Sequence, residues 1–564
     1  MKRIFITVFV AACFSVVAGA QDTYYAEMLS RNNYYGTARS IGLGNAMTAL
    51  GGDLGSVNIN PAGSAVGTYG QFTITPGLLF SSTGASYSPD GSQAFGSTIK
   101  TPHTKFNLPN IGLTLKFYSD PGSWVSNITA GFVANTTNTY LNYSTGRGDN
   151  SSTSFLGSLA AGARGTAWGD LPRDLYAGYA ANQFGEYGPV GSNMYVGSNE
   201  RLNPEETVHY VPGALDQTAV YNTFGSKTDI AFNLAFNVQD NFYFGFNLGF
   251  PTLKYRRQEV FSESAVEPAQ FPVVFFDKNN NKVSTNYLNS SNSYTLNTNA
   301  TGFYAKFGFI ALPTEHLRIG AAIQTPTMYG ISERWVYGAS SKYADSRFDG
   351  SANSSVGEAN YQLRSPYVVD AGIAYTLPGV GLFSIDYELN DYSVMKYSDE
   401  EGGYFYEDAW AGTNLVNRTF CGLSHSVRVG VEVKPLPFFA LRAGYSMITD
   451  PEKYWLDENG DRVTAETVQF LGNSYSFKQK LQTSHYFSNT THAVSLGAGY
   501  SSNGSFFADV AARMTAYPVS YYSPYYYGAY AATDASGKLL NVGAPLERIE
   551  RNVFDVVLTL GWRF

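Results

Sequence analysis

The sequence predicts an all-β fold: a transmembrane antiparallel β-barrel of about 14 strands with an N-terminal hatch inside its lumen. Three observations lead to this prediction. Apolar and polar residues alternate with a period of two, short and long connections alternate along the chain, and only 15% of the 564 residues are charged. Because soluble proteins usually carry roughly 25% charged residues, something other than a charged aqueous surface covers much of this molecule.

The first 20 residues form a predicted signal peptide. A basic start and an apolar stretch lead to Ala18-Gly19-Ala20, which supplies the small residues of a cleavage site. Cleavage before Cys13, as in a lipoprotein, is an alternative, but the apolar run continues past that residue. Removal of residues 1–20 leaves Cys421 as the only cysteine, so we expect no intramolecular disulfide and no thiol or metal site.

Composition limits the remaining classes of protein. Beyond residue 20 the sequence has no run of about 18 consecutive apolar residues, so helical membrane spans are not expected. Only a closed barrel could then cross a bilayer, because every backbone N–H and C=O must be paired within the protein. The formal charge of −8 and the lack of a Lys/Arg-rich run argue against a nucleic-acid partner.

The final segment shows the alternation most clearly. One face carries Phe554, Val556, Leu558, Leu560, Trp562 and Phe564. The other face carries small and polar residues, and the segments 232–239, 383–390 and 426–434 alternate in the same way. Ending on Phe resembles the C-terminal signal of outer-membrane barrels. Alternation alone does not separate a barrel from a two-sheet sandwich.

The connections favour the barrel. Tight polar or Pro/Gly turns are predicted at residues 119–123, 239–241, 312–316, 377–381, 434–437 and 501–505. Much longer connections are predicted near residues 81–107, 141–226, 257–297, 337–359, 399–416, 450–490 and 517–551. This alternation is typical of outer-membrane barrels, with short periplasmic turns at one rim and long loops at the other. We therefore assign residues 71–564 to the barrel.

Residues 21–70 do not alternate and are rich in Gly, Ala and Asn. A barrel of about 14 strands is too wide for its wall side chains to fill and narrower than the open porins of about 16 to 18 strands. Its lumen therefore needs contents, and we expect residues 21–70 to form a hatch or plug there.

The hatch segment carries a specific resemblance. The stretch from Gly36 to Asp53, continuing to Asn60-Pro61-Ala62-Gly63, resembles the N-terminal hatch of the FadL/TodX family of outer-membrane transporters. Similar strand endings are Leu317-Arg318-Ile319-Gly320, Val427-Arg428-Val429-Gly430 and Leu441-Arg442-Ala443-Gly444-Tyr445. The resemblance covers most of the mature chain in layout and is sharp only in the hatch and these endings. It implies a plugged 14-stranded barrel that takes up long-chain fatty acids or aromatic hydrocarbons. The loop 141–226 is longer than in the simplest members.

Candidate site residues fall into two sets. In the hatch, Gly42, Gly44, Asn60 and Pro61 are the candidate gating residues, and Asn60-Pro61 is interpreted as a turn that directs the chain into the first strand. In the outer loops, the candidate ligand-capture residues are Phe271, Val273, Phe275, Phe276, Tyr525 and Tyr526. An acyl chain of about 15 methylenes gains on the order of 12 kcal/mol at an apolar site. Packing between loops is the alternative role of these residues. Apolar residues at helical spacing from Phe155 to Ala181 predict a helical cap.

Three further motifs resemble functional sites but lack residues that those sites require. Gly42-Leu43-Gly44 lacks the preceding strand and the third glycine of a dinucleotide site. Asp457, Asn459 and Asp461 have the spacing of a calcium loop without its glutamate at the twelfth position, so a hairpin turn is favoured. His425, between Ser424 and Ser426, is the nearest approach to a lipase pair.

The sequence thus predicts a passive transporter of hydrophobic small molecules in the bacterial outer membrane, not an enzyme, with no cofactor and no metal. We expect a monomer whose other partners are outer-membrane lipid and lipopolysaccharide. A general porin, or a surface-exposed structural or adhesive barrel, remains the alternative function.

Overall fold

The computed structural model describes most of the chain from residue 23 to residue 564. The described part leaves out residues 68, 92–93, 121, 190, 204–208, 277–278, 280, 400–409, 457–461, 464–479, 484–489, 503–504, 526–535, 537, 539 and 541–542. The predicted signal peptide, Cys13, Tyr526 and the Asp457–Asp461 motif therefore lie outside the described residues.

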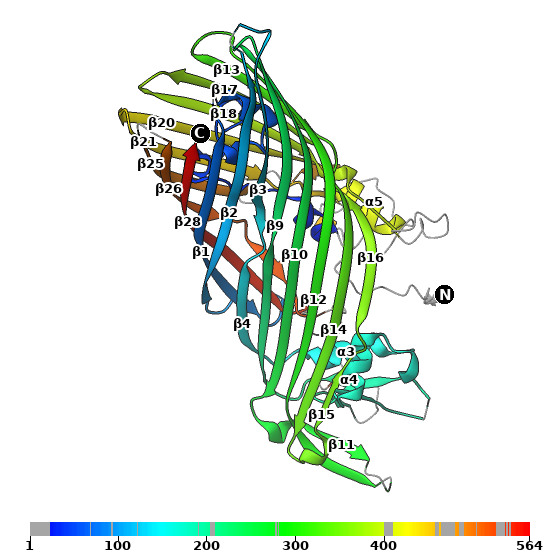
Figure 1. The fold of residues 1–564 in the computed structure, drawn as a ribbon. Helices are drawn as coiled ribbons and strands as arrows, with labels where there is room; N and C mark the ends of the chain where they lie inside the picture. The colour runs from blue at the N-terminus through cyan, green and yellow to red at the C-terminus, as the bar shows by residue number, and fades with distance from the viewer. Residues whose placement is uncertain are drawn as a thin grey trace.

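The described strands build a closed antiparallel barrel with 14 wall positions (Figure 1). In chain order they are β1 (Gln71–Ser88), β2 (Ile99–Ser119), β3 and β4 (Val125–Thr139, Asn142–Asn150), β9 (Leu215–Val238), β10 (Phe242–Ala265), β12 (Lys282–Ala311), β13 and β14 (Leu317–Gln324, Met328–Tyr343), β16 and β17 (Gly357–Arg364, Val368–Leu377), β18 and β19 (Gly381–Asp391, Lys396–Asp399), β20 (Leu423–Leu436), β21 (Phe439–Thr449), β25 (Thr490–Ser501), β26 and β27 (Phe506–Ala516, Ser520–Tyr522) and β28 (Leu546–Arg563). The barrel closes where β28 pairs with β1, from Gln71 opposite Arg563 to Ser88 opposite Leu546. The predicted fold class is confirmed.

Short turns gather at one end of the barrel, together with the C-terminus (Figure 1). Neighbouring strands are joined there by two to five residues, as between β9 and β10 or β12 and β13. At this end Phe117, Trp124 and Phe564 are among the exposed aromatic residues, which suits a membrane interface. No helix in the described ranges is long and apolar enough to cross a bilayer.

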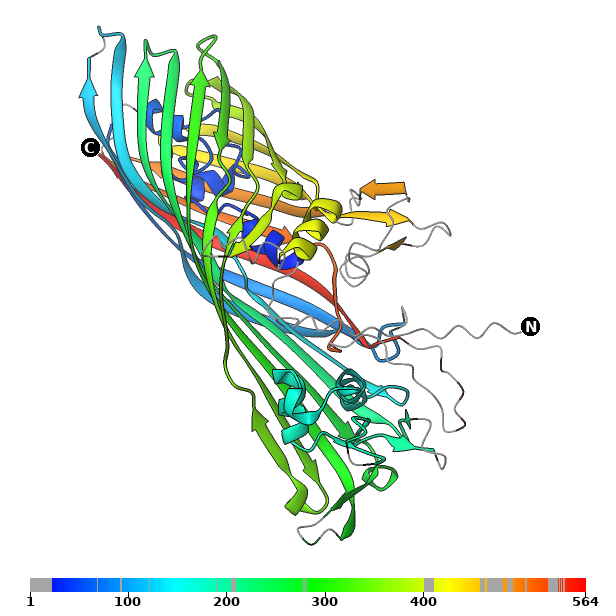
Figure 2. The ribbon, with the colours of Figure 1, turned by 90° about the vertical axis from the view of Figure 1, so that its right-hand side faces the viewer.

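The hatch lies inside the barrel, in the half near the short turns (Figure 2). It contains α1 (Thr23–Ser30), α2 (Ala38–Gly42) and the 3-10 helices η1 (Leu54–Ser56) and η2 (Pro61–Val66). The predicted turn at Asn60-Pro61 takes a different form, because Asn60 caps η2 and Pro61 is its first residue. η2 therefore stands between this turn and β1.

The long-loop end carries the remaining described elements. They are α3 (Phe155–Ala163), η3 (Trp168–Asp170), α4 (Arg173–Ala180), β5 (Phe184–Glu186), β6 (Tyr195–Gly197), β7 (Arg201–Leu202), β8 (His209–Tyr210), η4 (Pro268–Gln270), β11 (Pro272–Phe276), η5 (Ser346–Phe348), β15 (Gly350–Asn353), η6 (Tyr392–Val394), α5 (Ala411–Phe420), β22 (Lys453–Leu456), β23 (Arg462–Val463) and β24 (Lys480–Thr483). The helical spacing from Phe155 to Ala181 is borne out by α3 and α4.

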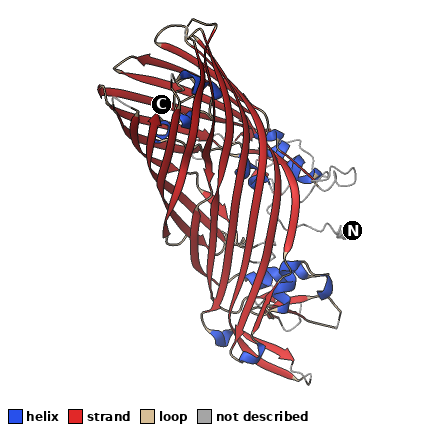
Figure 3. Cartoon of the chain, viewed as in Figure 1, coloured by secondary structure: helices blue, strands red, loops and turns tan. Residues whose placement is uncertain are grey.

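Three predicted long loops are mostly strand: 81–107, which the ends of β1 and β2 occupy, 257–297 and 337–359. The segment 257–297 is occupied by the ends of β10 and β12, and the segment 337–359 by β14, β15 and β16 (Figure 3). These strands are very long, 24 residues in β10 and 30 in β12. The prediction of loops there is wrong because apolar and polar residues keep alternating in these strands. The apolar residues, however, move from the outward face of the wall to the face toward the lumen.

The exchange is plain in β10. Up to Phe250 the outward positions are apolar, and Leu248 and Phe250 are exposed. Beyond Thr252 the outward positions carry Lys254 and further polar residues, while Leu253 is buried toward the lumen. The wall therefore has an apolar outer belt near the short turns and a polar outer face beyond it. The apolar belt is what a bilayer requires, and the wall beyond it faces water.

Neighbouring strands are interrupted where the outer face of the wall changes from apolar to polar. β13 gives way to β14 at residues 325–327, β16 to β17 at 365–367 and β18 to β19 at 392–395. Two of the breaks contain a proline, Pro326 and Pro366, which cannot donate a ladder hydrogen bond. We call the wall beyond these breaks the outer extension: β4, β14, β15, β16 and β19 with the long-loop ends of β9, β10 and β12.

Candidate functional site

Glycines of the wall receive the backbone of the hatch. A Cβ atom at Gly444 of β21 would lie 2.1 Å from the backbone N of Gly44. A Cβ at Gly430 of β20 would lie 2.5 Å from the carbonyl O of Leu43, and one at Gly320 of β13 would lie 2.2 Å from that of Thr48. The glycines of the three similar strand motifs are therefore the wall positions on which the hatch backbone packs.

The predicted gating glycines belong to the same contact. Gly44 has a φ of +62°, which favours glycine, and a Cβ there would lie 2.8 Å from the backbone N of Tyr445. A Cβ at Gly42 would lie 3.4 Å from the Cα of Gly497 on β25. Gly44 thus allows close packing of two backbones, whereas a Cβ at Gly42 would make only ordinary van der Waals contacts.

Asn60 joins the hatch both to itself and to the wall. Its side-chain N donates to the carbonyl O of Thr48 at 2.6 Å and to that of Phe309 on β12 at 3.0 Å. Its side-chain O accepts from the backbone N–H of Ala62 at 3.1 Å. The side chain is fully buried, so Asn60 anchors the hatch at the wall.

Charged side chains complete the seal between hatch and wall. Arg442 donates to Glu432 at 2.7 Å, and Glu432 also accepts from Arg39 of α2 at 3.3 Å. Lys306 pairs with Asp370 at 2.9 Å in a fully buried contact. Because these charges are buried and paired, loss of one partner would leave the other uncompensated. The hatch therefore combines these polar contacts with a small apolar cluster of its own, which includes Leu43, Met47, Leu50 and Ile59.

α1 is held by one buried ammonium group. Lys227 of β9 donates to the carbonyl oxygens of Leu29, Ser30 and Arg31 at 2.9, 3.2 and 2.7 Å. These carbonyls end α1, where a helix leaves its last acceptors unpaired and attracts positive charge.

A large apolar cluster surrounds α1 above the polar seal, and we call it the lumen cluster. Its main members are Tyr25, Leu29, Tyr140, Leu253, Tyr255, Tyr294, Leu296, Tyr329, Ile331, Trp335, Tyr337, Tyr361, Leu363, Tyr392, Met395 and Tyr397. Most of them come from the outer extension, where the wall turns its apolar face inward. Tyr25 packs edge-on against Tyr255 with ring centroids 5.6 Å apart.

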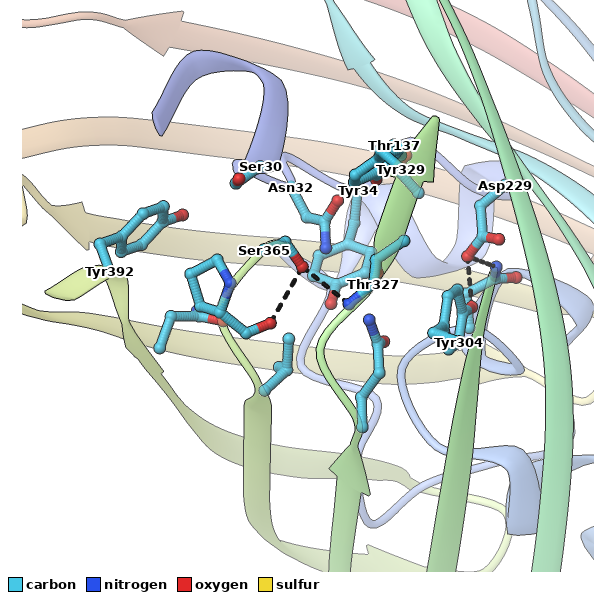
Figure 4. A pocket seen from close by; sticks show the side chains of 15 residues that line it. Ser30, Asn32, Tyr34, Thr137, Asp229, Tyr304, Thr327, Tyr329, Ser365 and Tyr392 are labelled. Carbon is cyan, nitrogen blue, oxygen red and sulfur yellow. Dashed lines mark hydrogen bonds between the residues drawn. The ribbon is translucent and has the colours of Figure 1, made fainter. Parts of the chain in front are cut away.

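A small polar cavity lies between α1, the strand breaks and β9 (Figure 4). Its volume is about 20 Å³, enough for about one water molecule. The Tyr34 hydroxyl and the Oδ1 atom of Asp229 lie in its lining and have no protein hydrogen-bond partner among the described residues. Tyr329 and Tyr392 belong both to this lining and to the lumen cluster, so the cavity adjoins the apolar region.

Two of the predicted ligand-capture residues, Phe271 and Tyr525, belong to a second apolar group, the outer cluster. It includes Tyr87, Phe155, Leu156, Leu159, Phe184, Tyr195, Leu215, Phe261, Phe271, Tyr287, Tyr343 and Tyr525. Phe271 packs on Tyr287, with ring centroids 6.3 Å apart, and Tyr525 packs on Phe155, with ring centroids 5.7 Å apart. Both are buried among other residues of this cluster.

The other residues of that prediction are less enclosed. Phe275 stacks on Phe348 with ring centroids 4.6 Å apart, and Val273 is half-buried beside it. Phe276 is 58% exposed at the end of β11. The structure therefore brings Phe271 and Tyr525 into one cluster and leaves Phe276 at the surface. A role in capture stays a prediction for all of them.

The alternation of β20 separates the residues of the lipase motif. Ser424 and Ser426 are buried on the lumen side, and the Ser424 hydroxyl donates to the carbonyl O of Thr449 at 2.6 Å. His425 points the other way and bonds the Tyr387 hydroxyl through Nδ1 at 2.6 Å. This arrangement holds no serine and histidine pair.

Sequence reasoning missed the lumen cluster. Its signal is the change of parity in β10, from apolar residues at even positions up to Phe250 to apolar residues at odd positions from Leu253. A strand that exchanges its apolar face has left the lipid and encloses an apolar interior.

Comparison with known proteins gave matches among solved structures only. No protein-family model and no curated protein sequence matches this chain. Similar structures include the toluene transporter TodX of P. putida, with 11% identity, a TM-score of 0.44, and coverage of 94% of this chain and 99% of that one. A FadL homologue of Pseudomonas aeruginosa has 12% identity and a TM-score of 0.46, with coverage of 95% and 98%.

The toluene transporter TbuX of Ralstonia pickettii is similar to the same degree, with 12% identity, a TM-score of 0.44, and coverage of 94% and 99%. These structures carry the names of the family that the hatch resembles, and two of them are named as toluene transporters. At such identities and TM-scores, the function of this chain has to be inferred from its own residues.

Proposed function

We propose that this chain is a passive outer-membrane transporter for uncharged hydrophobic molecules, closed by its hatch. The lumen cluster carries the proposal, because it is an aromatic interior enclosed by a wall whose outer face is polar. A general porin needs a polar, water-filled lumen instead. An adhesive barrel has no use for an apolar interior around a polar-sealed plug.

Charge at the cluster favours an uncharged ligand over a carboxylate. Asp229 borders the polar cavity, and Glu333 is buried beside Thr298 at 3.0 Å. The cation Lys227 is held by three carbonyl oxygens. A fatty-acid anion would therefore meet buried acids without a free cation in the described lining, and burial of an uncompensated charge is costly. Toluene-like molecules or alcohols avoid that cost.

Trp335 tests the lumen cluster directly. Replacing Trp335 by Ala removes a ring that is 3% exposed, and we expect the affinity for a neutral aromatic probe such as naphthalene to fall by about tenfold, since aromatic side chains dominate such contacts. Equilibrium binding to detergent-solubilised protein measures this, with decanoate as the anionic comparison. Trp124→Ala removes a ring that is 68% exposed at the short-turn end and should leave binding unchanged. Equal losses in both variants, or tighter binding of decanoate than of naphthalene, would contradict the proposal.

Asn60 tests the hatch as a gate. Asn60→Ala removes the cap of η2 and both hydrogen bonds to carbonyls, which should destabilise the seated hatch by about 1–3 kcal/mol. We expect more frequent ion-conducting openings in planar bilayers and faster uptake of a labelled hydrophobic probe into liposomes. Pro61→Ala should act in the same direction and more weakly. The control is Asn299→Ala, an exposed outward position of β12. If Asn60→Ala shows normal conductance and normal uptake, Asn60 and Pro61 do not act as gating residues.

A further inference from the structure

Two cationic side chains stand opposite each other on the outward face of the barrel. Arg364, the last residue of β16, is the direct antiparallel partner of Lys396, the first residue of β19. The preceding pair, Leu363 and Tyr397, is buried toward the lumen. Alternation therefore directs Arg364 and Lys396 outward, and both are exposed.

This pairing is unfavourable by itself, because like charges directly opposite each other on a sheet repel. Within the described residues neither side chain forms an ion pair with a carboxylate. The outward cations of β14 differ in this respect. Arg334 pairs with Glu358 at 3.1 Å and Lys342 with Asp349 at 2.8 Å. An uncompensated pair beside compensated ones points to an anion that the described residues do not supply.

The pair lies at the boundary of the apolar belt. Arg364 is also the partner of Met328 on β14, and Met328 is the partner of Phe303 on β12. Met328 and Phe303 are 47% and 46% exposed on the outward face. One side of the cationic pair is therefore an apolar surface at the edge of the membrane-facing belt, and the strand break at Pro366 follows at once.

Arg364 is also oriented by the fold. Its Nη2 atom donates to the carbonyl O of Val394 in η6 at 3.2 Å, which fixes the guanidinium across the break between β18 and β19. Its remaining N–H groups stay available. A planar guanidinium beside an ammonium matches the several acceptor oxygens of a phosphate.

We propose that Arg364 and Lys396 form a binding site for the phosphate of an anionic membrane lipid, whose acyl chains lie against Met328 and Phe303. The phosphate neutralises the repulsion between the two cations, and the apolar neighbours select a lipid over a free anion. The site is independent of what passes through the lumen, and it requires only that the apolar belt lies in a bilayer.

The test uses the full mature chain in a neutral detergent, titrated with dioleoyl phosphatidic acid and followed by native mass spectrometry. We expect the double variant Arg364→Gln/Lys396→Gln to bind this lipid at least about tenfold more weakly. The matched control Arg334→Gln/Lys342→Gln removes two outward charges farther from the belt and should change binding by less than about twofold. Equal losses in the two double variants, or no loss in the first, would overturn the site.

Two further measurements complete the test. The first distinguishes a lipid phosphate from free inorganic phosphate, and the second uses a variant that should be more stable than the parent. Inorganic phosphate at millimolar concentration should displace little lipid, and full displacement would make this a general anion site rather than a lipid site. Lys396→Glu places an acid opposite Arg364, so its melting temperature in lipid-free detergent should rise, and phosphatidic acid should no longer stabilise it. A melting temperature that does not rise, or stabilisation by phosphatidic acid that persists, would contradict the proposed repulsion.

Discussion

Replacing Gly444 by Val is expected to unseat the hatch. The new side chain would begin 2.1 Å from the backbone N of Gly44, and backbone atoms on both sides cannot give way as a flexible side chain can. We expect a loss of more than about 4 kcal/mol for the seated state, the range of severe core defects. The barrel wall should persist, because β20, β21 and β25 keep their pairing.

Conductance in planar bilayers and the unfolding midpoint in urea measure this effect. The variant should show a large and steady conductance where the parent is nearly closed, together with a lower midpoint. Gly330→Val on β14 is the control, because a Cβ at Gly330 meets no atom within 4 Å. If Gly444→Val conducts and unfolds as the parent does, the hatch does not rest on these glycines.

Glu547→Gln is expected to make the protein more stable at alkaline pH. Glu547 is fully buried near the outer end of β28, opposite Tyr87 of β1 and beside Gly146 of β4. Burial raises the pKa of this carboxyl to about 8, and Ser144 offsets the rise only in part. An unfolded glutamate titrates near about 4.3, so the folded chain holds a proton that the unfolded chain releases between these two values.

The stability contributed by the protonated carboxyl is thus complete below about pH 4 and is lost as the pH rises to 8. By about pH 9 the penalty is on the order of 5 kcal/mol, and Gln removes it. Urea unfolding at pH 4 and at pH 9 measures the difference, which should be small at pH 4. Glu550→Gln, at an outward position paired with Arg548, is the control. A parent whose stability does not fall over this range would contradict the buried, protonated state.

Much of the fold could be predicted because its signals are local. Strict alternation and short polar turns depend on neighbouring residues, so the wall strands near the short turns and the helices at Phe155–Ala181 follow from the sequence. The seat of the hatch is different. Nothing local shows that Gly44 meets Gly444 across 400 positions, although both stand in motifs that resemble those of a known family. The resemblance to a known family, rather than composition, singled out both motifs, but it predicted no contact between them.

The lumen cluster was missed for another physical reason. A rule that assigns apolar residues to lipid and polar ones to the interior holds only while the wall lies in the membrane. Beyond Phe250 and Phe303 the same alternation has the opposite meaning, and the polar residues of β10 from Gln258 onward fall in a segment that the sequence predicts as a loop. The prediction that Phe271 and Tyr525 capture a ligand rests on the apolar composition of their segments. Apolar residues are typical both of packing between loops and of ligand binding, so composition does not separate the two roles.

The length of the wall has a consequence for where a ligand first meets the protein. β12 has 30 residues, which at a rise of about 3.3 Å spans on the order of 100 Å of chain, whereas the lipid-facing band of such barrels is about 25 Å tall. Even after allowance for tilt, tens of ångströms of rigid sheet rise above the headgroups. On the proposed function, a hydrophobic molecule that arrives from the aqueous side would reach the rim of this sheet before it reached any acyl chain. Strand length would thereby set the distance from the bilayer at which the protein first meets its ligand.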